Sequence, residues 1–188
     1  SLSQANVELI YSDAFIAIDH LLKQQKSFDS IIVDLPDPSH PDLNKLYSVN
    51  FYARLNQLLS GDGLIAIQST SPYHAKEAFI SIGKTVKAAD FSDVQQYHDN
   101  VPSFGEWGWT IASKRGLSPL ARLKTLDKFQ VEQQWLTLPM LIGAFEFSQD
   151  FYQFDNEIQI NYLGSHTIYQ LHQKAWRNQQ GLENAYAQ

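Results

Sequence analysis

A buried strand can be placed in this sequence before anything else. Residues 30–35 are Ser-Ile-Ile-Val-Asp-Leu, and Pro36 and Pro38 end the run. A nearly continuous apolar run of this length is typical of a strand inside a parallel sheet. Parallel neighbours need a crossover of about a dozen residues or more, usually a helix. We therefore expect strands to alternate with helices.

The first 114 residues repeat this alternation. We expect strands at residues 7–12, 30–35, 63–68, 93–98 and 108–113. Helices are predicted to begin at Asp13, at Ser48 and near Ala75, because apolar residues then recur at helical spacing on one face. The two closing strands can pair antiparallel. The pattern predicts an α/β sheet with helices on both faces.

Residues 115–188 have a different character. Residues 117–120 are expected to form a linker, and helices are predicted near 137–144 and 165–178. Five aromatic residues gather in the segment 145–154. A cofactor-binding cluster is conceivable, but packing against the α/β region is the favoured interpretation.

Composition excludes several classes of protein. The chain has 188 residues, no cysteine and a net charge of −6. Disulfides, iron–sulfur clusters and thiol catalysis are therefore excluded, and an acidic chain is a poor nucleic-acid binder. No apolar run approaches the roughly 20 residues of a membrane-spanning helix, and the first residues do not resemble a signal peptide. We expect a cytoplasmic protein.

The strongest local motif follows the strand at 30–35. Asp34 and Asp37 stand three residues apart on a loop stiffened by prolines. In an open α/β sheet this strand end is where ligands bind. The two acids could equally form an ordinary turn in which each caps a nearby amide. His40 has no second histidine at metal-ligand spacing, so no metal site is expected.

Four motifs in this order resemble the polyamine aminopropyltransferases, the family of spermidine synthase. They lie at residues 28–41, 46–52, 61–73 and 101–109. The sequences of these motifs are most similar to those of the family branch that has a fused N-terminal membrane region. The resemblance implies transfer of an aminopropyl group from decarboxylated S-adenosylmethionine to a polyamine such as putrescine. Spermidine and methylthioadenosine would be the products, with no other cofactor.

The resemblance also assigns site residues. Asp34 matches the family's proton acceptor, and Asp37 matches its polyamine-binding partner. Pro41 matches a position that lines the nucleoside pocket. Asp13 and Ala14 match an Asp-Gly pair that contacts adenine, although alanine replaces the glycine here.

The resemblance implies that two further segments take part in substrate binding. Residues from Gln68 and Ser69 to Ser71 correspond to the rim of the family's substrate groove. Phe104 falls at or near a family tyrosine, in a loop that is two residues shorter. The missing phenol would remove one hydrogen bond to the amine, which puts activity or polyamine choice in question.

The family's first strands, its Gly-rich loop and its ribose-binding acid have no counterpart here. We therefore expect a partial Rossmann-like sheet, similar to S-adenosylmethionine methyltransferases but lacking two strands. Residues 1–114 would be part of a catalytic domain, and residues 115–188 an α-rich extension packed on it. The simplest explanation is that the chain is the carboxyl-terminal part of a longer protein. The resemblance to the membrane-fused branch implies tethering of that protein to a membrane on the cytoplasmic side.

An incomplete sheet leaves a strand edge open. We expect residues 7–12 to pair beside 30–35, or a homodimer to cover the edge. Two functions from different classes stay open: an aminopropyltransferase that needs its missing part, and a non-catalytic module that binds a nucleoside or a polyamine. A methyltransferase is a weaker third, because two acids suit a cationic acceptor.

Overall fold

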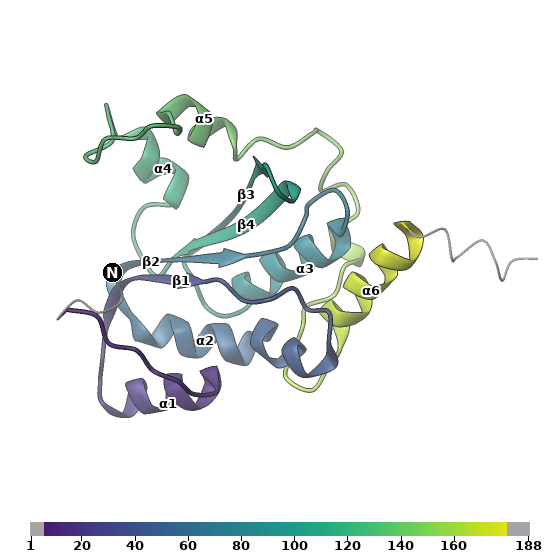
Figure 1. Cartoon of the computed structure of the whole chain (residues 1–188), viewed down its shortest axis with the longest axis horizontal. Helices are drawn as coiled ribbons and strands as arrows, with labels where there is room; N and C mark the ends of the chain where they lie inside the picture. Colours follow the sequence, from purple (N-terminus) through teal and green to yellow (C-terminus); the bar gives the residue numbers. More distant parts are fainter. Residues whose placement is uncertain (1–5, 180–188) are drawn as a thin grey trace, which may run out of the picture.

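The computed structural model describes residues 6–179, and a four-stranded sheet lies at its centre (Figure 1). The strands are β1 (Phe28–Val33), β2 (Leu59–Gln68), β3 (Asp93–Val101) and β4 (Gly105–Ser113). Their order across the sheet is β1-β2-β4-β3. β1 and β2 are parallel, whereas β4 is antiparallel to both β2 and β3. The predicted α/β class and the antiparallel closing strands are confirmed.

Three helices pack on one face of the sheet. They are α1 (Ala14–Lys23), α2 (Val49–Leu58) and α3 (Lys76–Lys87). The alternating pattern of β2 turns Ile65 and Ile67 toward these helices, where both side chains are fully buried. Phe51, Tyr52 and Ile82 complete this core from the helices. The carboxyl ends of β1 and β2 are thereby held side by side.

Polar caps fix where the first two of these helices begin. Asp13 caps α1, with its Oδ1 accepting from the backbone N–H of Phe15 at 2.9 Å. Ser48 caps α2 in the same way through Phe51, at 3.3 Å. Both residues are favourable N-caps, so these two helix starts agree with the prediction. A 3₁₀ helix, η1 (Pro41–Tyr47), lies between β1 and α2.

The carboxyl-terminal region continues with α4 (Pro119–Lys124), α5 (Leu138–Gly143), η2 (Asp155–Glu157) and α6 (Thr167–Gln179). The linker predicted at 117–120 is wrong, because Ser118 caps α4 and Pro119 occupies its first turn. The aromatic segment packs as expected. Phe147 and Phe151 lie against Phe79 of α3, and Phe151 is fully buried. α6 packs on α3 and η1.

The strand predicted at residues 7–12 is wrong. The segment has no regular structure and its side chains are exposed. β1 pairs with β2 alone, so the expected pairing of 7–12 beside β1 is also wrong. A strand forms only where a neighbour accepts its hydrogen bonds, and residues 7–12 pair with no strand within residues 6–179. The homodimer stays a prediction.

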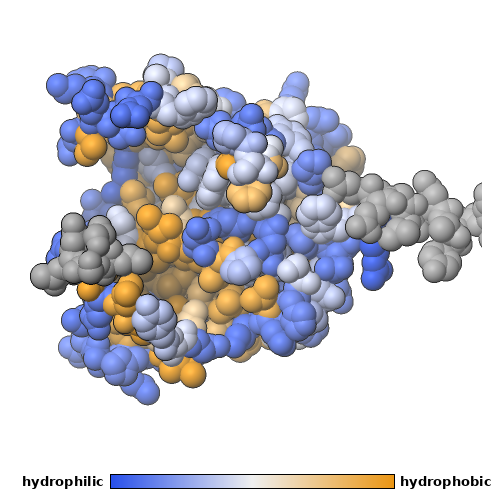
Figure 2. Space-filling model, in the orientation of Figure 1, coloured by the Kyte–Doolittle hydropathy of each residue, from blue (hydrophilic) through white to orange (hydrophobic). Residues whose placement is uncertain are grey.

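The second face of the sheet is covered unevenly. α4 packs against β3 and β4, whereas Ile32 of β1 is 81% exposed. Figure 2 shows hydrophobic residues gathered in the hollow between the α4–α5 region at the top and α1 at the bottom. Within the described residues no helix is both long and apolar enough to cross a membrane.

Candidate functional site

The two predicted carboxylates lie at the carboxyl end of β1. Asp34 follows the strand directly and is exposed, and Asp37 is partly buried three residues later. Gln68 ends the neighbouring strand β2, so the parallel pairing of β1 with β2 brings its side chain to the same edge. The structure therefore brings together two of the predicted site residues, Asp37 and Gln68.

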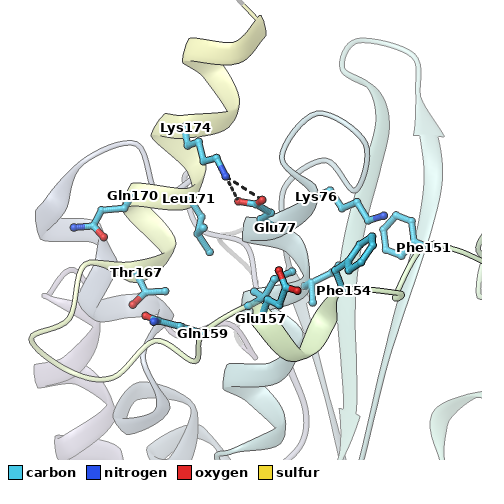
Figure 3. A pocket seen from close by; sticks show the side chains of 12 residues that line it. Lys76, Glu77, Phe151, Phe154, Glu157, Gln159, Thr167, Gln170, Leu171 and Lys174 are labelled. Atoms are coloured by element: carbon cyan, nitrogen blue, oxygen red, sulfur yellow. Dashed lines mark hydrogen bonds and ion pairs between the residues drawn. The ribbon is translucent and has the colours of Figure 1, made fainter. Parts of the chain in front are cut away.

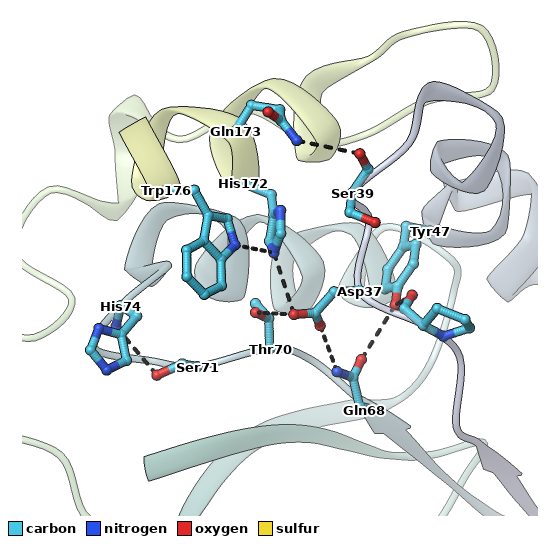
Figure 4. Close-up of polar contacts among 11 residues, drawn as sticks. Asp37, Ser39, Tyr47, Gln68, Thr70, Ser71, His74, His172, Gln173 and Trp176 are labelled. Atoms are coloured by element: carbon cyan, nitrogen blue, oxygen red, sulfur yellow. Dashed lines mark hydrogen bonds and ion pairs between the residues drawn. The ribbon is translucent and has the colours of Figure 1, made fainter. Parts of the chain in front are cut away.

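Asp37 lies at the centre of a polar network (Figure 4). Gln68 donates through Nε2 to Asp37 Oδ1 at 2.7 Å, and Thr70 donates through Oγ1 to Oδ2 at 3.3 Å. His172 Nε2 of α6 is also 3.3 Å from Oδ2. These contacts hold the carboxylate in one orientation. His172 is 135 residues away in sequence, and no local pattern pointed to it.

A buried tyrosine supports the loop that carries both acids. The Tyr47 hydroxyl lies 2.8 Å from the carbonyl oxygen of Pro36 and 3.3 Å from Gln68 Oε1. Burial, and then the negative charges of Asp37 and Asp34, raises the pKa of Tyr47 above its ordinary value. Tyr47 therefore stays protonated and donates its hydrogen bond to the nearer acceptor, the Pro36 carbonyl, which ties the loop to η1.

The segment after β2 is tightly constrained. Thr70 has a φ of 63°, a left-handed conformation that is uncommon for threonine. Its carbonyl accepts from Gly108 N–H at 2.9 Å, which anchors the turn to β4. Ser69 is fully buried, and its Oγ lies 2.9 Å from Thr110 Oγ1. The predicted role of the Ser69 side chain at a groove rim is therefore unsupported by its position.

A cavity of about 380 Å³ opens beside Asp37. Four segments line it: the loop after β1, the turn between β2 and α3, the β3–β4 hairpin and α6. Phe104 and Trp107 come from the hairpin, with ring centroids 5.4 Å apart, and Trp176 comes from α6. Phe104, a predicted site residue, thus lines the same cavity as Asp37. A carboxylate among aromatic walls suits an organic cation.

The predicted nucleoside residues lie in a different arrangement. Asp13 Oδ1 caps α1, and its Oδ2 lies 2.8 Å from Lys45 Nζ. The Lys45 hydrogen bond, followed by that of Phe15, lowers the pKa of Asp13. Ala14 is partly buried behind this cap. Pro41 and Lys45 line a separate cavity of about 350 Å³. Both oxygens of Asp13 therefore already have partners.

A larger cavity, of about 460 Å³, lies between α3, α6 and η2 (Figure 3). It contains none of the predicted site residues. Its lining includes an ion pair of Lys174 with Glu77, 3.1 Å apart, which joins α6 to α3. Size alone therefore does not identify the site.

Two asparagines that the sequence analysis missed hold α6 over the site. Asn44 of η1 donates to Asn161 Oδ1 at 3.0 Å, and Asn161 donates back to the Asn44 carbonyl at 3.1 Å. Asn44 Oδ1 also accepts from the backbone N–H of Tyr169 in α6, at 3.2 Å. Both asparagines are almost fully buried, so these bonds are costly to break.

No group of three or more histidine, aspartate or glutamate side chains that could hold a metal ion is found among residues 6–179. The site as described is a carboxylate pair, one carboxylate fixed by hydrogen bonds and the other exposed. An aromatic cavity adjoins it. Such a site can bind an amine and accept a proton.

Comparison with known proteins agrees with this chemistry. The spermine/spermidine synthase domain family matches residues 1–125. The chain is 52% identical over 183 residues to a polyamine aminopropyltransferase of Shewanella oneidensis, covering 97% of this chain and 32% of that protein. A polyamine aminopropyltransferase of Oceanobacillus iheyensis is 32% identical over 180 residues, covering 95% and 33%. The chain thus spans about a third of the length of these curated relatives.

Solved structures show the same fold. A spermidine synthase from Thermotoga maritima superposes with a TM-score of 0.67 at 19% identity, covering 84% of this chain and 52% of that one. A spermidine synthase in complex with the transition state analogue AdoDATO gives 0.66 at 18% identity, covering 84% and 51%. Fold, motifs and family match agree, and this chain belongs to the spermine/spermidine synthase family.

Proposed function

We propose that the chain forms the acceptor side of an aminopropyltransferase active site. The reaction transfers an aminopropyl group from decarboxylated S-adenosylmethionine to a polyamine such as putrescine. The amine nitrogen attacks the propyl carbon beside the sulfonium, and a C–N bond forms. The C–S bond breaks and its electron pair returns to sulfur, which leaves methylthioadenosine. The product amine is spermidine.

The two acids have distinct roles in this reaction. An alkyl ammonium has a pKa near ~10, and only its neutral form can attack. Asp34 accepts the proton and orients the lone pair of the nitrogen. Asp37 binds the remaining positive charge of the polyamine. Alignment of amine and sulfonium supplies much of the remaining acceleration.

One observation carries the proposal: Asp37 is fixed by Gln68 and Thr70 at the mouth of an aromatic cavity, three residues from an exposed Asp34. The fixed carboxylate suits binding, because its orientation needs no further ordering when a cation arrives. The exposed carboxylate suits proton transfer, because it can pass the proton on to solvent. Phe104 and Trp107 supply apolar surface for the methylene chain.

The proposal also concerns whether the 188 residues can catalyse the reaction without further segments. Asp13 is engaged by Lys45 and by its own helix, so little of it is available for adenine. We infer that catalysis needs a full-length protein that supplies a Gly-rich loop and a ribose-binding acid. The chain by itself is then inactive in aminopropyl transfer.

The decisive experiment is Asp34→Asn in the full-length enzyme, assayed with decarboxylated S-adenosylmethionine and putrescine. We expect kcat to fall about 100-fold or more, because a positioned general base contributes at least that much. The fold should stay intact, since Asp34 is exposed. Methylthioadenosine formation is the quantity to measure.

Asp29→Asn is the matched control, because Asp29 is an exposed aspartate on the same strand but lies near its other end. Its kcat should equal that of the parent enzyme. Equal turnover by the Asp34→Asn variant and the parent would overturn the assignment.

A non-catalytic polyamine-binding module is the second candidate. The observation in its favour is that the acceptor side has a defined cavity whereas both oxygens of Asp13 are occupied. A full-length protein that binds putrescine but forms no methylthioadenosine would support it over the enzyme.

A further inference from the structure

The cavity of about 380 Å³ beside Asp37 is called the acceptor cavity below. Helix α6 brings Trp176 to this cavity and His172 to Asp37, and both residues lie beyond the family match, which ends at residue 125. His172 and Trp176 are four residues apart and therefore lie on the same face of α6. In Figure 4 this face points toward Asp37, and His172 lies between Trp176 and the carboxylate. Gln173 also donates to the Ser39 carbonyl at 3.3 Å, which ties α6 to the loop after β1.

The hydrogen-bond partners of His172 are incompatible with one fixed arrangement. Its Nε2 lies 3.3 Å from Asp37 Oδ2 and 3.1 Å from Trp176 Nε1. A carboxylate can only accept, and an indole nitrogen can only donate. In a neutral imidazole Nε2 therefore serves one neighbour or the other. Nδ1 is buried and has no hydrogen-bond partner within residues 6–179.

Building on the proposed function, we propose that α6 forms the acceptor-selecting wall of the site. Trp176 supplies an aromatic surface for the cationic chain of a linear di- or triamine. His172 is a positioning residue that exchanges its Nε2 between Asp37 and Trp176. Acceptor binding would then depend on His172 and Trp176 of the carboxyl-terminal region as well as on residues 1–125.

The chemistry of the cavity favours a linear polyamine over other cations. Asp37 provides one negative charge, the indoles of Trp107 and Trp176 provide π-faces, and Phe104 adds a third aromatic ring to the lining. Ammonium groups bind both carboxylates and indole faces, and the methylenes between them need apolar surface. Trp176 is 46% exposed without a ligand, so its ring has room to receive one.

Occupancy of the cavity explains the exchange. Without an amine, Nε2–H of His172 donates to Asp37. When an ammonium group donates to Asp37 instead, the imidazole changes tautomer: Nε2 gives its proton to solvent and Nδ1 takes one up. Nε2 then accepts from the Trp176 indole N–H. The indole is then held against the bound chain. Binding of the acceptor and ordering of Trp176 are thus coupled through one imidazole.

The first test measures binding without turnover. The indole N–H signals of the ¹⁵N-labelled chain are recorded by NMR during titration with 1,4-diaminobutane, and Trp176→Phe assigns the signal of Trp176. We expect this signal to move downfield and saturate, since the indole gains a hydrogen bond. Butane-1,4-diol, which has the same length and no charge, should leave it unmoved. Equal shifts with diol and diamine, or a static signal while the diamine binds, would overturn the proposal.

The second test measures kinetics in the full-length enzyme. Trp176→Ala should raise the KM for putrescine about tenfold, the scale of a desolvated cation–π contact, with kcat within about twofold. Trp135→Ala is the matched control, because Trp135 is 77% exposed and lines no part of the acceptor cavity. An unchanged KM in Trp176→Ala, or an equal rise in Trp135→Ala, would reject the wall.

His172 is tested by two substitutions that fill the same space. His172→Phe removes both nitrogens and should raise the KM for putrescine. His172→Gln keeps an amide N–H near the position of Nε2 and should restore most of the affinity. Equal KM values in the two variants would show that His172 only fills space.

The two tests separate this proposal from the proposed function. If the full-length protein forms no methylthioadenosine, the enzyme assignment fails, yet the NMR titration still decides whether Trp176 and Asp37 bind a diamine. If turnover is normal and Trp176→Ala behaves as the parent, the α6 proposal alone fails.

Discussion

The two predicted sides of the active site differ in what their carboxylates do. On the acceptor side, Asp37 is held by side chains from β2 and α6, and it faces a cavity. On the nucleoside side, Asp13 caps α1 and pairs with Lys45. Both residues match motif positions, and both carboxylates have hydrogen-bond partners, but of the two it is Asp37 that lines the cavity of about 380 Å³. A motif match therefore identifies a position, and the cavity beside the side chain decides its availability to a ligand.

Removing the two charges should reveal this difference most strongly. In the full-length enzyme, Asp37→Asn should raise the KM for putrescine about 30-fold or more, because loss of one partner of a partly buried charge pair costs about 2 kcal/mol or more. Asp13→Asn should leave that KM unchanged, since asparagine caps helices as well as aspartate does. Steady-state kinetics with varied putrescine measures both. A similar rise in the two variants would remove the distinction between the sides.

The acceptor side also depends on backbone packing, which a glycine tests. A Cβ on Gly108 would overlap the Phe79 ring and lie 3.0 Å from the Thr70 carbonyl oxygen. Gly108→Ala should lower the free energy of unfolding by about 1–3 kcal/mol, as overpacking of a core does. Denaturant unfolding measures the change. Gly61→Ala is the control, because nothing lies within 4 Å of its Cβ position, and a loss of equal size there would contradict the packing argument.

Ligand binding by the isolated chain compares the two sides directly. Calorimetry with methylthioadenosine should show no binding tighter than about millimolar, a free energy near −4 kcal/mol. The reason is that Asp13 already has partners and no Gly-rich loop is present in the sequence. Micromolar affinity would show that these residues form a complete nucleoside pocket.

Local chemistry was predictable from the sequence. Asp13 and Ser48 cap helices through amides two or three residues away, and the apolar runs of β1 and β2 follow from their own composition. The motifs likewise brought Asp37 and Gln68 together, because parallel strands end at the same edge of a sheet.

The features that the sequence analysis predicted wrongly or missed depend on contacts with residues far away in sequence. The strand at residues 7–12 has the right composition, but it has no neighbour to pair with in the described residues. His172 reaches Asp37 across 135 residues, and Asn44 reaches Asn161 across 117. A histidine or asparagine in a polar helix or loop looks ordinary until the fold supplies its partner. The residues missed at the site are therefore those whose contacts join the carboxyl-terminal region to the rest of the chain.

The smallest expected effect concerns the pair that occupies Asp13. Its pKa in the folded chain is lowered from 3.8, chiefly by the hydrogen bond from Lys45. Because the folded value lies below the unfolded one, the stabilisation is present at neutral pH and is lost as pH falls through the folded value. Lys45→Met should raise the pKa of Asp13 toward its ordinary value. Parent and variant should then differ most in unfolding free energy near neutrality and least in acid.

Carboxyl ¹³C titration by NMR measures this pKa directly, with Asp19 as internal reference because its partner is Arg54. Lys26→Met serves as the charge-matched control, since Lys26 is exposed and lies beyond the end of α1. Its Asp13 titration should follow that of the parent. If Lys45→Met leaves the Asp13 titration unchanged, the lysine does not hold the carboxylate, and only the cap of α1 still engages Asp13. That result would weaken the contrast between the two sides.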